Sequence, residues 1–239
     1  MAVGSLYREP EAQPEAFDWP ALELHDVFKI YRSGPVESVA LRGLELEVEK
    51  GELVALLGPS GCGKSTLLNL AAGLDLPSAG EVRAFGQSLA MLDDAELAEY
   101  RAKRVAIVFQ SENLWPFLTA HENVATALRL SGLGGVSSRA SAALKAVGLD
   151  SRAHHRVAEL SGGEQQRTAI AAAAAREASL VLADEPTGEL DTDNEQIVLQ
   201  LLAGLAKENG SAVIVVTHSQ EVANSADRVV ELRDGQLAR

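Results

Sequence analysis

The sequence has only one cysteine, Cys62, and it lacks any long apolar run. A single cysteine cannot form an intrachain disulfide, which favours a reducing compartment and predicts a location in the cytosol. A membrane-spanning helix needs about 18 consecutive apolar residues, whereas the longest apolar runs here, such as 53–57 and 212–216, have the length of strands. Any role at a membrane therefore requires a partner.

Basic residues are also scarce, because 21 Lys and Arg face 34 Asp and Glu and give a formal net charge of -13. This excess of negative charge disfavours attraction to phosphate backbones, so we expect no nucleic-acid partner. The N-terminus lacks the apolar stretch behind a basic start that an export signal requires. Its acidic and proline residues predict a flexible, solvated extension over residues 1–20.

The remaining residues, 21–239, have the length of one domain with some elaboration. Alternating apolar residues near 22–27 and 44–48, with charges between them, predict an antiparallel sheet with one face open to water. Short continuous apolar runs separated by helical stretches predict a buried parallel sheet instead. These runs are 53–57, 105–109, 180–183 and 212–217.

The segment from about 113 to 160 has the pattern of helices and loops, including a helix near 138–147. We interpret it as a helical insert, because its two ends lead back into core elements. An alanine-rich patch at 171–175 predicts a closely packed helix. The predicted fold is α/β, with a mainly parallel core sheet, an N-terminal antiparallel β subdomain and an inserted α-helical subdomain.

A glycine-rich loop follows the first apolar run and precedes a predicted helix at 65–72, as in phosphate-binding loops. Its glycines let backbone N–H groups converge on phosphate oxygens at a helix N-terminus. Lys64 is expected to reach the β- and γ-phosphates of ATP, and Ser65 to ligate Mg²⁺. Cys62 is either a passive filler or a redox switch. The whole loop consists of Gly58, Pro59, Ser60, Gly61, Cys62, Gly63, Lys64, Ser65 and Thr66.

Two carboxylates, Asp184 and Glu185, directly follow the apolar run 180–183. Open parallel sheets bind ligands at the carboxyl ends of their strands. We expect Asp184 to hold Mg²⁺ and Glu185 to orient and deprotonate an attacking water. Two acids also occur at ordinary strand ends, so this interpretation depends on the lysine loop being present in the same chain.

A second helix start, at Ser161, is also rich in glycine. Ser161 and Glu164 have the spacing of a capping box, which does not explain Gly162 or Gly163. Bare backbone N–H groups at this helix start would form a second anion site. One ATP does not need both sites from one chain, so the sequence predicts two copies that meet head to tail with ATP between them.

These motifs resemble, in order and spacing, the nucleotide-binding domain of ATP-binding cassette (ABC) transporters, a family of P-loop NTPases, from about Leu22 to Gly235. The resemblance implies an ATPase in which Tyr31 stacks on adenine and Gln110 contacts Mg²⁺ and the attacking water. It implies further that Ser161, Gly162, Gly163 and Glu164 form the family signature, that Asp191 lies in a loop joining the two active sites, and that His218 contacts the γ-phosphate. Without the other motifs, Tyr31 and His218 would be ordinary packing and strand-end residues.

A narrower resemblance concerns residues 113–124 and 186–191, which are similar to the LolD/MacB/FtsE-like branch of lipoprotein-release, macrolide-export and cell-division ATPases. It implies a membrane permease with few transmembrane helices (MacB/FtsX-like) as partner, and a place at the inner face of the cell membrane. The chain would energise export, lipoprotein release or mechanotransmission. An FtsE-like regulator of cell-wall enzymes is the alternative, and a soluble ABC ATPase fits worst because the chain has no room for a coiled-coil insertion or a second cassette.

The bulky residues Trp115, Pro116, Phe117 and Leu118 follow Gln110 closely. We expect them to help line the groove that receives a permease helix, or else to pack within the helical insert. The chain differs from the residues usual in the family at Val157, Ala172 and Ser219, where proline, arginine and aspartate, respectively, are common. None of these departures removes a group expected to act in catalysis.

Overall fold

The computed structural model describes residues 18–34, 36–188 and 190–238. Most of the predicted N-terminal extension therefore lies outside the described residues. Of its last three residues, Asp18 pairs with Lys50 (Oδ1 to Nζ, 2.5 Å). The ring of Trp19 lies where a Cβ on Gly86 would stand, so these residues pack against the domain.

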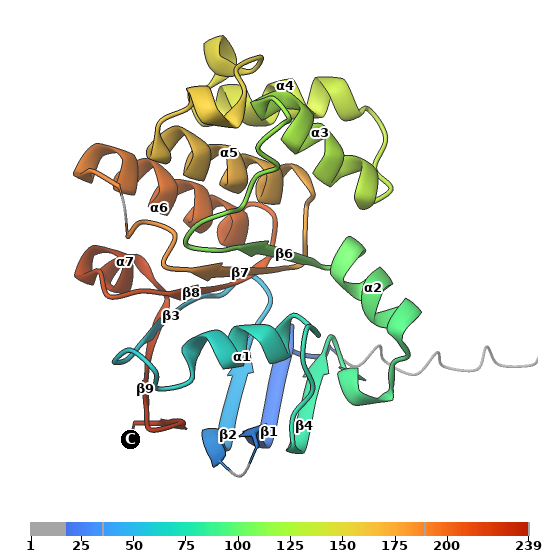
Figure 1. The fold of residues 1–239 in the computed structure, drawn as a ribbon, viewed down its shortest axis with the longest axis vertical. Helices are drawn as coiled ribbons and strands as arrows, with labels where there is room; N and C mark the ends of the chain where they lie inside the picture. Colours follow the sequence, from blue (N-terminus) through green and yellow to red (C-terminus); the bar gives the residue numbers. More distant parts are fainter. Residues whose placement is uncertain (1–17, 35, 189, 239) are drawn as a thin grey trace, which may run out of the picture.

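The described strands form two sheets (Figure 1). The first is antiparallel and four-stranded, in the order β2-β1-β4-β5. The second is six-stranded, in the order β10-β9-β3-β8-β7-β6, and only the β10–β9 pair in it is antiparallel. The strands are β1 Leu22–Ser33, β2 Val36–Val48, β3 Leu53–Leu57, β4 Ala79–Ala84, β5 Gln87–Ser88, β6 Val105–Val108, β7 Leu180–Asp184, β8 Ala212–Val216, β9 Arg228–Arg233 and β10 Gln236–Leu237.

Helices lie between and outside the sheets (Figure 1). Helix α1 lies between the two sheets, α5 and α6 lie on the other face of the parallel sheet, and α3 and α4 lie beyond α5. Of the described helices, none is both long and apolar enough to cross a membrane. They are α1 Lys64–Ala71, α2 Asp94–Lys103, α3 Ala120–Leu130, α4 Val136–Ala146, α5 Gly162–Ala175, α6 Thr192–Lys207 and α7 Gln220–Ser225, with short 3-10 turns at Leu89–Met91, Asp150–Arg152 and Val157–Glu159.

Helix α5 contributes to two hydrophobic cores, because its small side chains let the parallel sheet approach on one side and α3 and α4 on the other. Ile170 and Ala173 pack with the parallel sheet and α6, whereas Ala171 packs with α3 and α4. The expectation of a closely packed alanine helix is therefore confirmed. The four predicted parallel runs are confirmed too, since they form the adjacent strands β3, β8, β7 and β6.

Arg176, the C-cap of α5, connects the helical insert to α2. Its Nε donates to Ser131 Oγ at 2.8 Å, and Ser131 is the C-cap of α3. Its Nη2 donates to the carbonyl oxygens of Arg101 (2.8 Å) and Ala102 (2.9 Å). Burial lowers the pKa of Arg176. The buried guanidinium has lost its hydrogen bonds to water, and these acceptors replace them so that burial of the charge is tolerated.

We predict that Arg176→Met lowers the free energy of unfolding by about 2 kcal/mol, because hydrogen bonds from a charged donor are lost while the acceptors remain. Chemical denaturation measures the change. Arg129→Met on the exposed surface of α3 is the control and should change stability by less than about 0.5 kcal/mol. Equal effects of the two substitutions would contradict this role of Arg176.

Candidate functional site

The carboxyl ends of β3, β8, β7 and β6 meet along one edge of the parallel sheet, where a cleft of about 690 Å³ opens. The residues lining it come from the loops that follow these strands, from the end of β7, from the start of α1, and from β1 and β2. The cleft therefore brings together most of the side chains that the sequence singled out. Its lining is Tyr31, Ala40, Ser60, Gly61, Gly63, Lys64, Ser65, Thr66, Gln110, Asp184, Glu185, Gly188 and His218.

Lys64 is the first residue of α1 and is only 8% exposed. Its ammonium donates to the carbonyl oxygens of Gly58 (2.7 Å) and Pro59 (3.0 Å). These bonds use two of the three ammonium protons, which leaves one for an oxygen of a ligand. Gly63 precedes Lys64 with φ 110°, and a Cβ there would stand 2.5 Å from the carbonyl oxygen of Ala40. The loop thus requires glycine at this position.

The side chain of Cys62 points away from the cleft and is buried in the core between the sheets. Its Sγ stands 2.8 Å from where a Cβ on Gly58 would be placed. Cys62 does not line the cleft, nor do Gly58 and Pro59, which hold Lys64 through their carbonyl groups. The buried thiol favours the passive-filler interpretation over the redox switch, which needs an accessible thiol.

Ser65 and Asp184 are in direct contact within the cleft, since Ser65 Oγ donates to Asp184 Oδ2 at 2.8 Å. A hydroxyl and a carboxylate oxygen are ligands that suit Mg²⁺, which usually takes one or two protein oxygens and completes its shell with phosphate and water. Among the described residues no group of three or more His, Cys, Asp or Glu side chains is placed to hold a metal. The donor set fits an ion bound together with a phosphate ligand.

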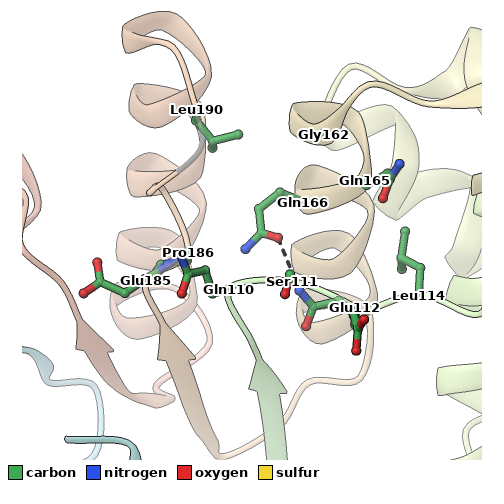
Figure 2. Close-up of a pocket in the computed structure, with 11 residues that line it drawn as sticks. Gln110, Ser111, Glu112, Leu114, Gly162, Gln165, Gln166, Glu185, Pro186 and Leu190 are labelled. Carbon is green, nitrogen blue, oxygen red and sulfur yellow. Dashed lines mark hydrogen bonds between the residues drawn. The ribbon is translucent and has the colours of Figure 1, made fainter. Parts of the chain in front are cut away.

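Glu185 and His218 also meet in the cleft, with His218 Nε2 at 3.1 Å from Glu185 Oε1. Glu185 has φ 48°, an uncommon value for a residue other than glycine, and its N–H donates to Val216 O at 2.9 Å. Strained backbone of this kind persists where the surrounding structure enforces it, and it is concentrated at functional sites. Glu185 lines the cleft together with Gln110, which Figure 2 shows close to it.

Tyr31 stands at the mouth of the cleft and is 41% exposed. Its hydroxyl donates to Asp75 Oδ2 at 3.2 Å, and the ammonium of Lys29 lies 5.0 Å from its ring centroid. Lys29 also pairs with Asp75 at 2.6 Å. Burial opposes ionisation of Asp75, but the hydrogen bond from Lys29 and the neighbouring donors hold its pKa below the ordinary value. Tyr31 is thus held in place with an exposed ring.

The predicted capping box at the start of α5 is present, since Ser161 Oγ accepts from Glu164 N (3.2 Å) and Glu164 Oε2 from Ser161 N (2.8 Å). The bond from the Ser161 N–H holds the pKa of Glu164 low, and Arg152 lies 3.3 Å from its carboxylate. Glu164 is therefore occupied in holding the helix start. Gly162 is exposed, and a Cβ there would meet no atom within 4 Å.

The start of α5 does not line the large cleft. Gly162 lines a separate pocket of about 100 Å³, which shares Gln110 and Glu185 with the cleft (Figure 2). Asp191 lines neither pocket; it is the N-cap of α6, where its Oδ1 accepts from Asn194 N at 2.9 Å and from Asn194 Nδ2 at 2.7 Å. The structure thus places most lysine-loop residues in the cleft, whereas the serine-glycine motif of the same chain does not line it.

Sequence reasoning missed two amide side chains, Asn113 and Gln166, that join β6 to α5. Phe109, the residue before Gln110, donates through its N–H to Asn113 Oδ1 at 2.7 Å, and its carbonyl accepts from Asn113 Nδ2 at 2.6 Å. Gln166 Nε2 donates to the same carbonyl at 3.3 Å, and its Oε1 accepts from Asn113 Nδ2 at 3.2 Å. Figure 2 shows Gln166 reaching from α5 toward this loop. A polar residue on the buried side of α5 is the signal that could have identified Gln166.

Residues 41–188 match a family model described as ABC transporter. The chain is 46% identical over 219 residues to the lipoprotein-releasing system ATP-binding protein LolD of Chromohalobacter salexigens, covering 91% of this chain and 92% of that protein. It is 41% identical over 230 residues to the macrolide export ATP-binding/permease protein MacB of an Azoarcus species, covering 95% of this chain but only 35% of that protein.

Solved structures of an ATP-binding cassette named MJ0796 are also similar. Two dimeric structures of it, one of them in a post-hydrolysis state with ADP and Pi, superpose with a TM-score of 0.86 at 41% identity. Each covers 91% of this chain and 97% of that chain. The fold expected from the sequence is therefore confirmed as that of an ABC ATPase.

We predict that Lys64→Met weakens ATP binding by roughly 10- to 100-fold, because it removes the cation that faces the phosphates. Titration with a fluorescent ATP analogue measures the affinity. Lys103→Met, which removes an exposed lysine paired with Glu99 on α2, is the control and should bind normally. Unchanged affinity in Lys64→Met would show that the loop does not bind the phosphates.

Proposed function

This chain belongs to the ABC transporter family, and from that premise we propose how its residues bind ATP, how two copies cooperate and what they move. The chain is an ATP-binding and ATP-hydrolysing subunit similar to the LolD and MacB ATP-binding proteins. The observation that carries the proposal is the single cleft that holds Lys64, Ser65, Asp184, Glu185 and His218 together.

ATP binds with its adenine against the exposed ring of Tyr31 and its phosphates in the loop 58–66. Two observations support this. Tyr31 lines the same cleft as Lys64, and Gly61 and Gly63, which adopt positive φ, line the cleft next to Lys64. Lys64 and the N–H groups at the start of α1 stabilise the phosphate charges. Mg²⁺, when held by Ser65 and Asp184, would neutralise charge between the β- and γ-phosphates.

Hydrolysis proceeds by attack of a water that Glu185 orients and deprotonates, with Gln110 beside it. His218 lies within hydrogen-bond distance of Glu185 and can contact the γ-phosphate from the same side. These groups act mainly by positioning the reactants and stabilising charge, which is the general strategy of phosphoryl transfer. The contact of 3.1 Å with His218 supports this role, because it places the Glu185 carboxylate beside a second group of the cleft.

A second copy of the chain completes the site. The serine-glycine motif at 161–163 lies outside the ATP cleft of its own chain, and Gly162 leaves the helix N-terminus bare toward solvent. In a head-to-tail homodimer that N-terminus faces the γ-phosphate held by the partner, as an anion prefers. The similar MJ0796 cassette was solved as a dimer, which supports this arrangement.

The dimer works on a membrane permease with few transmembrane helices (MacB/FtsX-like), at the cytoplasmic face of the membrane. Trp115 and Phe117 are 53% and 65% exposed and contact each other edge to face, with ring centroids 5.8 Å apart. They are therefore not packed inside the helical insert. A groove of about 360 Å³ lies between α2 and α3, and Trp115, Leu130 and Arg101 are among the residues that line it. Exposed aromatic residues beside a groove suit a protein partner.

Asn123 fixes the aromatic segment on α3, since its Oδ1 accepts from Trp115 N at 2.7 Å. Asn113 is hydrogen-bonded to the residue before Gln110 and also lines the groove. Movement in the groove can thus reach the ATP site through a short, hydrogen-bonded segment. The similarity to LolD, of a lipoprotein-releasing system, and to MacB, a macrolide export protein, supports a transport role for the complex.

We predict that Glu185→Gln retains ATP affinity but hydrolyses ATP about 100-fold more slowly or worse, since a general base contributes 10²- to 10⁴-fold or so. ATP-bound dimers should then accumulate, and size-exclusion chromatography with and without ATP detects them. The control is Glu208→Gln at the exposed end of α6. Near-normal turnover in Glu185→Gln would refute the assignment of the base.

We predict that Trp115→Ala weakens permease-stimulated hydrolysis roughly tenfold, because an aromatic anchor at an interface carries much of the binding energy. The assay compares ATP turnover of the chain alone with turnover after reconstitution with its permease. Met91→Ala is the control, since Met91 is 83% exposed and does not line the groove. Equal stimulation of both variants would place the permease contact elsewhere.

A further inference from the structure

The segment that carries His218 is held on both sides by hydrogen bonds. On one side, the buried Thr217 donates through its N–H to Leu56 O at 3.2 Å, and its Oγ1 accepts from Ser219 N at 2.9 Å. This attaches the segment to β3. The side chain of His218 is itself 59% exposed. Its position in the cleft therefore depends on how residues 217 and 219 are held.

On the other side, the hydroxyl of Ser219 lies between two carboxylates. Its Oγ is 2.7 Å from Glu195 Oε1 and 3.0 Å from Glu221 Oε2. The same oxygen accepts from Val222 N at 3.4 Å as the N-cap of α7. A hydroxyl has one proton and donates to one carboxylate at a time, so the shorter contact marks Glu195 as the stronger partner.

We propose that Ser219 is a positioning residue for His218, which it holds toward Glu185 through a hydrogen bond to Glu195. Glu195 lies in the first turn of α6. The bond therefore joins the histidine segment to α6, in addition to the bonds of Thr217 that join it to β3. This inference rests on the proposed role of His218 at the γ-phosphate.

The first turn of α6 also carries Asp191 as its N-cap. A displacement at the start of α6 would reach His218 through Glu195 and Ser219. A serine suits this position because a carboxylate at 219 would stand near both Glu195 and Glu221, and like charges at that distance repel. The serine at 219 is thus matched to its two acidic neighbours.

The test is steady-state ATP hydrolysis by the full chain, with kcat and KM determined separately. Ser219→Ala should lower kcat roughly tenfold at little-changed KM, because misplacing a group at the reacting centre lowers the rate more than binding. Ser219→Thr keeps the hydroxyl and should stay close to wild type. Ser219→Asp should lower kcat further, and adding Glu195→Gln should restore much of the loss, since an amide can donate to the new carboxylate.

Two comparisons separate positioning from a merely structural role. In a His218→Ala background, Ser219→Ala should lower kcat no further, because the residue acts through the missing imidazole. Glu221→Gln is the matched control and should leave kcat near wild type, although it removes a carboxylate at a similar distance from the same hydroxyl.

The inference is overturned if Ser219→Ala has wild-type kcat, or if its effect persists fully without His218. It is also overturned if Glu195→Gln gives Ser219→Asp no recovery. Failure of the proposed function has a different result, because His218→Ala itself would then hydrolyse ATP normally. A large loss in His218→Ala together with normal Ser219 variants would refute the positioning role alone.

Discussion

The parallel pairing of β3, β8, β7 and β6 is the constraint on which the site depends. Leu56 on β3 and Asp184 on β7 both align with Val216 on β8. The four strands therefore end within about one residue of the same level, and the lysine loop, the acidic pair and His218 lie as neighbours. A slip of one residue would move a strand by about 3.3 Å and break the contact of 2.8 Å between Ser65 and Asp184.

Helix α5 connects the parallel sheet to helices α3 and α4. Its alanines pack on the sheet and on α3 and α4 at once, so the serine-glycine helix start is carried on a rigid support between two cores. Gln166, one turn from Gly162, bonds to the carbonyl of Phe109 beside Gln110. Through Gln166, the ATP cleft of a chain is therefore connected to the start of α5 in the same chain. Such a connection suits a composite site in which that helix start contacts the ATP of a second copy.

The sequence predicted the four adjacent strands β3, β8, β7 and β6 well, because continuous apolar runs identify buried parallel strands. It missed β9, which pairs with β3, because Arg228 and Arg233 stand at its ends and Glu231 interrupts the short apolar run between them. It also missed β4, whose pairing with β1 depends on contacts distant in sequence. The motifs identified the cleft residues, but no local pattern could reveal that Cys62 turns into the core, that Asn113 and Gln166 meet, or that Ser219 contacts Glu195.

The most direct test of the composite site is to mix two defective chains. A Cβ added at Gly162 would meet no atom within 4 Å, so Gly162→Asp fits at the helix start, and its carboxylate would repel a γ-phosphate presented by a partner. We expect that Gly162→Asp alone does not hydrolyse ATP although its own Lys64, Asp184 and Glu185 are intact. Mixed with Glu185→Gln, it should regain turnover, because the heterodimer then has one intact site. Full activity of Gly162→Asp alone, or no activity in the mixture, would show that the site is not built from two chains.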